Sequence, residues 1–152
     1  MKLAEALILR ADTQKRIEQL RQRLARNARV QEGDQPAEEP QTLLAELEHA
    51  ATQLTDLVQR INRTNTVTEL EAGLSLSDAL AHRDTLTLRQ SVYKSLAAEA
   101  VVTQNRYSNS ELRYTSTVNV AAIQRVADDL ARERRELDTR IQSLNWQVDL
   151  LE

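Results

Sequence analysis

The sequence predicts an all-α fold of long antiparallel helical hairpins, arranged as a four-helix bundle or a coiled-coil assembly. The chain has 152 residues, with only two Gly, two Pro and no Phe, and it is rich in Leu, Ala, Glu, Gln and Arg. This composition favours helices over sheets. Apolar residues also recur at intervals of seven along most of the chain, as in packed helices. We expect one domain over residues 1–152, with helices at about 2–30, 41–64, 77–104 and 119–150.

The first two helices are expected to form a hairpin. In the first, one seven-residue frame contains Leu3, Arg10, Ile17 and Leu24, and the other contains Ala6, Thr13, Leu20 and Asn27. In the second, the frames contain Leu47, Leu54 and Ile61, and Leu43, Ala50 and Leu57. The stretch QEGDQPAEEP at 31–40 must interrupt the helix between them. A fold near residue 35 would place residue i opposite about residue 70 − i, and Arg10 beside Arg60.

The first two segments of the chain carry opposite charges. Residues 1–30 contain eight Lys or Arg and three acids, a balance of +5, whereas residues 31–62 contain seven acids and one Arg, a balance of −6. The stretch KRIEQLRQRLARNAR at 15–29 by itself is typical of a nucleic-acid arm. Because the acidic segment 31–62 would lie against it and the whole chain has a net charge of −3, we expect no nucleic-acid partner.

The second half of the chain predicts another hairpin. After Gly73, the helix at 77–104 has a wide apolar surface, with Ala79, Leu86, Tyr93, Ala97 and Ala100 on one side and Leu88 and Val92 on another. Such a surface indicates burial against more than one neighbour, so we expect a homo-oligomer. The last helix, 119–150, has Ile123, Leu130, Leu137, Leu144 and Leu151 at strict intervals of seven.

Two connectors have the pattern of short extended segments, near 66–70 and 111–117. Their composition suggests that they pair with each other. A simple up-and-down bundle would place them at opposite ends, so either they do not pair or they pair between subunits.

The sequence offers little recognisable chemistry. Cysteine is absent, which excludes thiol catalysis, thiolate metal sites and disulfides and is compatible with a reducing cytoplasm. Glu46 and His49 have the E-x-x-H spacing of di-iron bundles, but the leucine frame directs both toward solvent. We therefore predict no catalytic residues, no metal and no cofactor. No apolar run approaches the length of a membrane span, so we expect a cytoplasmic protein with no membrane partner.

A polar cluster at one end of the predicted bundle is the candidate site. The leucine stripe of the second helix gives way to RINRTN at 60–65, and the same end of an up-and-down bundle would receive polar residues of the other helices. The cluster comprises Asn62, Arg63, Asn65, Arg83, Asp84, Asp138, Asn145 and Trp146. In one interpretation these residues cap helix ends, with Arg63 or Arg83 paired to Asp84 or Asp138. In the other they form a ligand pocket or a subunit contact.

Four stretches, MKLAEALILRAD, RINRTN, ALAHRD and LDTRIQSLNW, together resemble the septicolysin-like family of small bacterial proteins. The resemblance spans nearly the whole chain and implies that the four stretches belong to one fold. The family name implies a cytolysin, and the resemblance supplies no catalytic residue.

These observations favour a non-enzymatic, self-associating structural or interaction module. The alternative is a small-molecule-binding or enzymatic bundle that uses the polar cluster. Nucleic-acid binding and a cytolysin are further alternatives.

Overall fold

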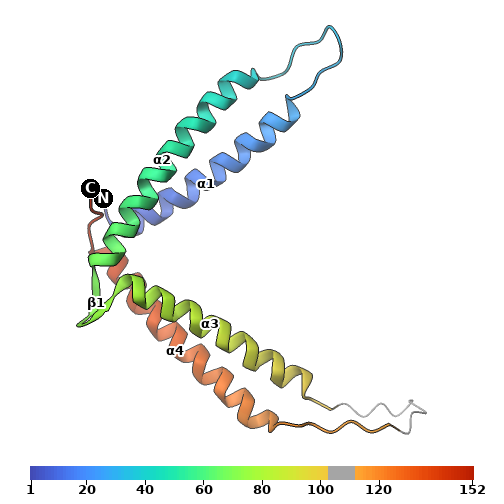
Figure 1. The fold of residues 1–152 in the computed structure, drawn as a ribbon, viewed down its shortest axis with the longest axis vertical. Coiled ribbons are helices and arrows are strands. Elements are labelled where there is room, and N and C mark those ends of the chain that lie inside the picture. Colours follow the sequence, from blue (N-terminus) through green and yellow to red (C-terminus); the bar gives the residue numbers. More distant parts are fainter. Residues whose placement is uncertain (103–111) are drawn as a thin grey trace. The chain divides into compact units, whose positions relative to one another are not determined.

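The computed structural model describes residues 1–102 and 112–152. Its elements in chain order are α1 (Leu3–Arg26), α2 (Pro40–Val67), β1 (Glu69–Glu71), β2 (Leu74–Ser75), α3 (Leu76–Glu99) and α4 (Val120–Gln147), as drawn in Figure 1. The mostly helical class that the sequence predicts is thereby confirmed, while a four-helix bundle or coiled-coil assembly stays a prediction.

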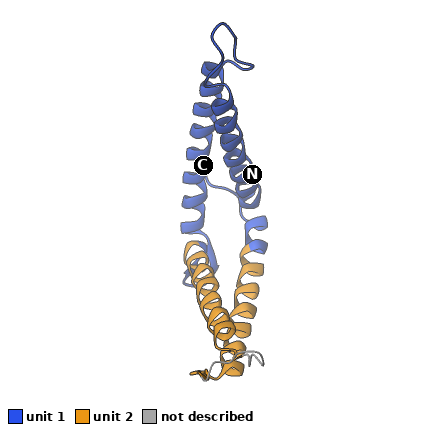
Figure 2. Cartoon of the chain, turned by 90° about the vertical axis from the view of Figure 1, so that its right-hand side faces the viewer, with its two compact units in different colours: residues 1–76, 142–152 blue, residues 77–141 orange. Residues whose placement is uncertain are grey.

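The chain divides into two compact units, coloured separately in Figure 2. Unit 1 contains residues 1–76 and 142–152, and unit 2 contains residues 77–141. The final turns of α4 and the C-terminal tail thus belong to unit 1. The single domain over 1–152 stays a prediction.

In unit 1, α1 and α2 lie side by side (Figure 1). They bury a shared apolar seam. The frame that the sequence places at Ala6, Thr13, Leu20 and Asn27 is buried at all four positions. On α2 the buried residues are Leu43, Ala50, Leu57, Ile61 and Thr64, again largely at intervals of seven. This spacing keeps one face of each helix against its neighbour.

Helix α1 ends at Arg26, four residues before the predicted end at 30. The backbone N–H of Asn27 donates to the carbonyls of Arg23 and Leu24, and its side-chain amide donates to the Arg23 carbonyl at 2.9 Å. Asparagine commonly ends helices in this way because its short side chain competes with the backbone ladder. The helix therefore stops before Gly33, which adopts a φ of 90° in the loop.

The predicted register of the hairpin is wrong by about two helical turns. Arg16 pairs with Glu46 across the hairpin at 3.5 Å, and these residue numbers add up to 62 instead of the expected 70. The earlier end of α1 contributes to this shift. Arg10 therefore does not lie beside Arg60 as predicted, and Arg60 instead donates from Nε to the Leu151 carbonyl at 2.9 Å.

Helix α2 continues to Val67, past the predicted end at 64. The segment predicted at 66–70 thus starts as helix, and the strand lies at β1. Its partner is β2, with Glu69 opposite Ser75 and Glu71 opposite Leu74. Gly73 provides the turn between them with a φ of 80°, which glycine adopts without strain.

The predicted strand at 111–117 is not observed. Residues 112–117 form no strand, and residue 111 lies outside the described residues. β1 instead pairs with the neighbouring β2, which needs only a short turn and no partner distant in the sequence.

In unit 2, α3 and α4 run side by side (Figure 1). The side chains buried there include Leu86, Ala97, Ala127, Leu130 and Leu137. Helix α3 ends at Glu99 instead of the predicted 104, and residues 103 and 104 lie outside the described part of the chain.

Helix α4 ends at Gln147, three residues before the predicted end, because the chain continues as an extended tail. The backbone of this tail pairs with the N-terminus of the chain. The N–H of Leu3 donates to the Val148 carbonyl, and the N–H of Leu150 donates to the Met1 carbonyl, each at 2.9 Å. The two ends of the chain are therefore joined within unit 1.

Candidate functional site

The residues of the predicted polar cluster belong to both units. Unit 1 contains Asn62, Arg63, Asn65, Asn145 and Trp146, and unit 2 contains Arg83, Asp84 and Asp138. The binding role of the eight residues stays a prediction.

The structure brings the three residues of unit 2 together. Arg83 on α3 donates from Nη1 to Oδ1 of Asp138 on α4 at 3.0 Å, and its Nη2 lies 3.5 Å from the Asp84 carboxylate. The pairing of Arg83 with these two acids, which is part of the helix-capping interpretation, is observed, and the role of the cluster as a whole stays a prediction. A guanidinium between two carboxylates has its charge satisfied, so this group ties the two helices together within unit 2.

The five residues of unit 1 lie in different environments. Asn145 is buried, with 4% of its surface exposed, whereas Trp146, the next residue, is 55% exposed. Asn62 and Arg63 are exposed on α2, and Asn65 is half-buried.

Thr64, which the sequence analysis did not select, is the most buried polar residue in the RINRTN stretch. Its hydroxyl donates to the Arg60 carbonyl at 2.8 Å and accepts from the backbone N–H of Leu151 at 3.0 Å. Arg60 closes the ring by donating to the Leu151 carbonyl. The C-terminal tail is thus fixed to the last turns of α2. Thr64 follows Leu57 by seven residues, so the seam frame could have identified it.

A shallow, open depression of about 410 Å³ lies beside this tail. It is lined by Asn62, Arg63, Thr66, Val67 and Leu151. The hydroxyl of Thr66 already donates to the Asn62 carbonyl at 2.9 Å. The depression therefore offers an apolar floor with one guanidinium, that of Arg63, and could hold a small apolar group with an anionic end.

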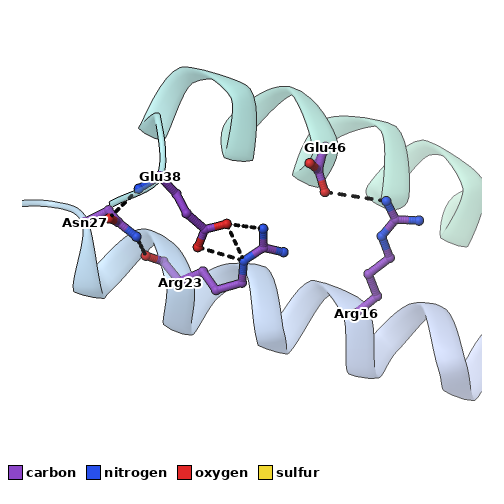
Figure 3. A network of polar contacts seen from close by, with 5 residues as sticks. All are labelled: Arg16, Arg23, Asn27, Glu38 and Glu46. Atoms are coloured by element: carbon purple, nitrogen blue, oxygen red, sulfur yellow. Dashed lines mark hydrogen bonds and ion pairs between the residues drawn. The ribbon is translucent and has the colours of Figure 1, made fainter. Parts of the chain in front are cut away.

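Polar contacts link α1 to the start of α2 at the other end of the hairpin (Figure 3). The guanidinium of Arg23 forms a two-pronged contact with the Glu38 carboxylate, with Nε 3.1 Å from Oε1 and 3.0 Å from Oε2. The backbone N–H of Glu38 donates to Oδ1 of Asn27 at 3.0 Å. Further from the loop, Arg16 on α1 pairs with Glu46 on α2. The opposite charges predicted to face each other across the hairpin do so at these two pairs.

In Glu18, Glu38 and Asp149, a hydrogen bond from a neighbouring cation lowers the pKa of the carboxyl group. The hydrogen bonds from Arg23 lower the pKa of Glu38, and the contact with Lys2 lowers the pKa of Asp149. Arg21 lowers the pKa of Glu18 in the same way. Glu18 and Asp149 are exposed and Glu38 is half-buried, and each shift favours an ionised carboxylate beside a cation. This is the pattern of structural ion pairs, unlike the buried groups with strongly perturbed pKa values that often mark catalytic sites.

The outer face of α3 is unusually apolar for an exposed surface. Leu88 is 66% exposed, Val92 59% and Leu96 40%. They recur every four residues, and Leu88 and Val92 lie on the side of α3 away from the buried Leu86 and Ala97. The exposed side of α4 in unit 2 is instead charged, with Asp128, Asp129, Arg132, Arg135 and Glu136. Of the two helices in unit 2, only α3 therefore has the character of a contact surface among the described residues.

Glu46, from the E-x-x-H motif, pairs with Arg16, and His49 is exposed. Within residues 1–102 and 112–152, no group of three or more His, Asp or Glu side chains is placed to hold a metal ion. Among the helices as described, none combines the length and the apolar character needed to cross a membrane.

Comparison with known proteins places the chain in a family. None of the curated proteins compared with the chain matches it. A crystal structure of a functionally unknown conserved protein from Corynebacterium diphtheriae is 49% identical, with a TM-score of 0.94 and a match that covers 99% of each chain. The resemblance to the septicolysin-like family stays a prediction. Residues 10–150 match the profile of the family of unknown function DUF6847. The chain therefore belongs to the DUF6847 family.

Proposed function

We propose that this protein is a non-enzymatic interaction module that associates with further copies of itself. The observation that carries the proposal is the exposed apolar face of α3, formed by Leu88, Val92 and Leu96. Large apolar side chains exposed singly are common on soluble proteins, but a contiguous stripe often marks a contact surface.

The charges around the hairpins support an interaction role over catalysis. Arg83, Arg23 and Arg16 each pair with a carboxylate from another part of the chain. These pairs hold helices and loops together and leave the charged groups already satisfied. A cysteine-free chain also suits a reducing compartment, so we propose a cytoplasmic protein.

Light scattering after size-exclusion chromatography at micromolar concentration tests the proposal. We expect a mass that is a multiple of the 17.3 kDa of the chain. The double variant Leu88→Glu/Val92→Glu should shift the protein to monomer, because it places charges in the apolar contact. Helical circular dichroism should be unchanged, since both residues are exposed.

The matched control is Thr87→Glu/Lys94→Gln, which makes the net charge more negative by the same amount at exposed positions on another side of α3. It should leave the oligomer intact. A wild-type mass of one chain at these concentrations would refute the proposed self-association.

The second candidate function is small-molecule binding in unit 1. It is favoured by the depression beside Arg63, which Asn62 also lines. Native mass spectrometry of the purified protein reports subunit number and any retained molecule in one measurement. A retained anionic molecule that is lost in an Arg63→Ala variant would favour this function. Its presence would be compatible with self-association through α3.

A further inference from the structure

Resting on the proposed self-association, we infer that two copies pair in parallel along the outer face of α3, with Asp84 of each copy opposite Arg89 of the other. Three features of α3 support this pairing, namely the spacing of its outer residues, their shapes and the charges on either side.

The outer residues of α3 have the spacing of a coiled-coil seam. Ala81, Thr85, Leu88, Val92 and Ser95 follow one another at alternating steps of four and three residues, and all five are exposed. This alternation keeps a narrow stripe facing one partner helix. α3 therefore has two seams, one against α4 within unit 2 and one that nothing in the described chain covers.

The shapes of the central residues favour a pair of helices over a larger assembly. In heptad terms, with letters a to g, Thr85 and Val92 occupy position a and Leu88 occupies position d. Residues branched at Cβ at position a, with leucine at d, favour parallel dimers over larger assemblies.

The charges beside the seam fix its direction. Asp84 precedes the first a residue, at position g, and Arg89 follows Leu88, at position e. In a parallel pair, position g of one helix lies beside position e of the next heptad of the other helix, five residues further on. Asp84 would thus meet Arg89 twice, once on each side of the twofold axis.

Both charges are available for this contact. The side chain of Asp84 is 75% exposed, and its one ion-pair contact within residues 1–102 and 112–152, with Arg83, has a distance of 3.5 Å. Arg83 has a closer partner in Asp138, at 3.0 Å. Arg89 is exposed and has no hydrogen-bond or ion-pair partner within the part of the chain that the structure describes. In an antiparallel pair, position g of one helix would instead lie beside position g of the other, and position e beside position e. Asp84 would then not contact Arg89.

Disulfide cross-linking tests the direction, and the natural chain is well suited to it because it has no cysteine. The variants Thr85→Cys, Leu88→Cys and Val92→Cys are made one at a time and oxidised at micromolar concentration. In a parallel pair each residue lies beside its own copy, so all three should form covalent dimers. In an antiparallel pair only a residue on the twofold axis could do so. Thr87→Cys, on another side of α3, should not cross-link.

Charge exchange tests the pairing of Asp84 with Arg89. Asp84→Arg and Arg89→Asp each place like charges together at two points of the dimer, so each should weaken dimerisation by about fivefold. The double variant Asp84→Arg/Arg89→Asp restores opposite charges and should recover wild-type dimerisation. The effect should diminish at high salt, since the pair is exposed.

The outcomes separate this inference from the proposed function. An oligomeric wild type in which at most one of the three cysteines cross-links, or in which the double charge variant is no better than the single ones, would overturn the inference and leave the proposed self-association standing. A monomeric wild type would overturn both. A covalent dimer at all three positions, with recovery in the double charge variant, would support the inference.

Discussion

The hydroxyl of Thr64 connects the end of α2 to the C-terminal tail. It donates to the Arg60 carbonyl one turn earlier and accepts from the Leu151 N–H. The side chain is fully buried, so neither partner of the hydroxyl can be replaced by bulk water. This explains why position 64 of the seam is a threonine, although Leu57 and Ile61 before it are apolar. A polar group is needed where the tail crosses the helix.

We predict that Thr64→Val destabilises the protein by about 1–2 kcal/mol, because the variant keeps the shape of the side chain but leaves the Leu151 N–H without its acceptor. Urea unfolding at neutral pH measures the change. The matched control is Thr52→Val, since Thr52 makes the same bond to the carbonyl four residues earlier but is exposed. This control should change the free energy of unfolding by less than about 0.5 kcal/mol. Equal losses for the two variants would contradict the proposed role of the tail.

Only part of this arrangement could be predicted from the sequence. The frame that contains Leu43, Ala50 and Leu57 reaches Thr64 at the next interval of seven, so its burial follows from the pattern. Its hydrogen-bond partner Leu151 lies 87 residues further along the chain. Nothing local to either residue indicates that contact, because a backbone N–H has no sequence signature. The pairing of Arg83 with Asp138 could be expected because both lie on periodic helices of one hairpin.

At the scale of elements, polar contacts at the loop end hold the α1–α2 hairpin in register. Asn27 ends α1 and accepts from the Glu38 N–H, and Glu38 then reaches back to Arg23 (Figure 3). The side chain of Glu39 begins α2 by accepting from the Gln41 N–H at 3.4 Å, with Pro40 at the first helical position. Proline is favoured there because that position needs no N–H donor. The loop therefore positions the ion pairs between the helices.

We predict that the stabilisation provided by Glu38 disappears in acid. Arg23 lowers the pKa of Glu38 in the folded protein, so folding favours the ionised carboxylate. The stabilisation is present above the pKa of an unfolded glutamate, about 4.3, and is lost as the pH falls through the lower folded value. Wild type should thus have a higher urea midpoint than Glu38→Gln at pH 7, and this difference should vanish in strong acid.

The control for this experiment is Glu48→Gln, because Glu48 is exposed and its side chain has no partner among residues 1–102 and 112–152. Its urea midpoint should follow the wild type from neutral pH to acid. If Glu38→Gln and wild type differ equally at pH 7 and in acid, the ion pair with Arg23 is not the source of the difference.

Helices were more predictable than strands in this chain. A helix of about 25 residues repeats its apolar pattern several times, whereas the strands β1 and β2 are three and two residues long. Two features led to the error in strand pairing. Residues 112–117 have strand-like composition without a strand beside them, and the turn at Gly73 joins two strands too short to show alternation.

At the scale of the whole molecule, the distribution of charged residues along the chain determines whether its basic segment can bind polyanions such as DNA. The balance of +5 in residues 1–30 is larger in magnitude than the net charge of −3 of the chain. Two of the basic residues pair across the hairpin, Arg16 with Glu46 and Arg23 with Glu38. Arg21 pairs with Glu18 within α1. The cationic helix is therefore largely neutralised where it is most basic.

We predict that the protein does not bind duplex DNA measurably at physiological salt. Binding to DNA requires several Lys or Arg side chains that are free to replace counterions on neighbouring phosphates. In α1 and its loop, only Arg10, Arg26 and Arg29 have no hydrogen-bond or ion-pair partner within the part of the chain that the structure describes. Fluorescence anisotropy with a labelled duplex measures the affinity, which should be weaker than a dissociation constant of about 100 µM.

A charge-reversed variant is expected to bind the duplex in the same experiment. Glu38→Lys/Glu46→Lys removes the carboxylates that face Arg23 and Arg16, which frees both guanidiniums and adds two cations beside them. This variant should bind the duplex in a strongly salt-dependent way. The control Glu48→Lys/Asp56→Lys changes the net charge equally at exposed positions of α2 without releasing either of those two arginines, so it should bind more weakly. Micromolar binding by the wild type, with a steep dependence on salt, would show that α1 remains an accessible cationic surface despite these pairs.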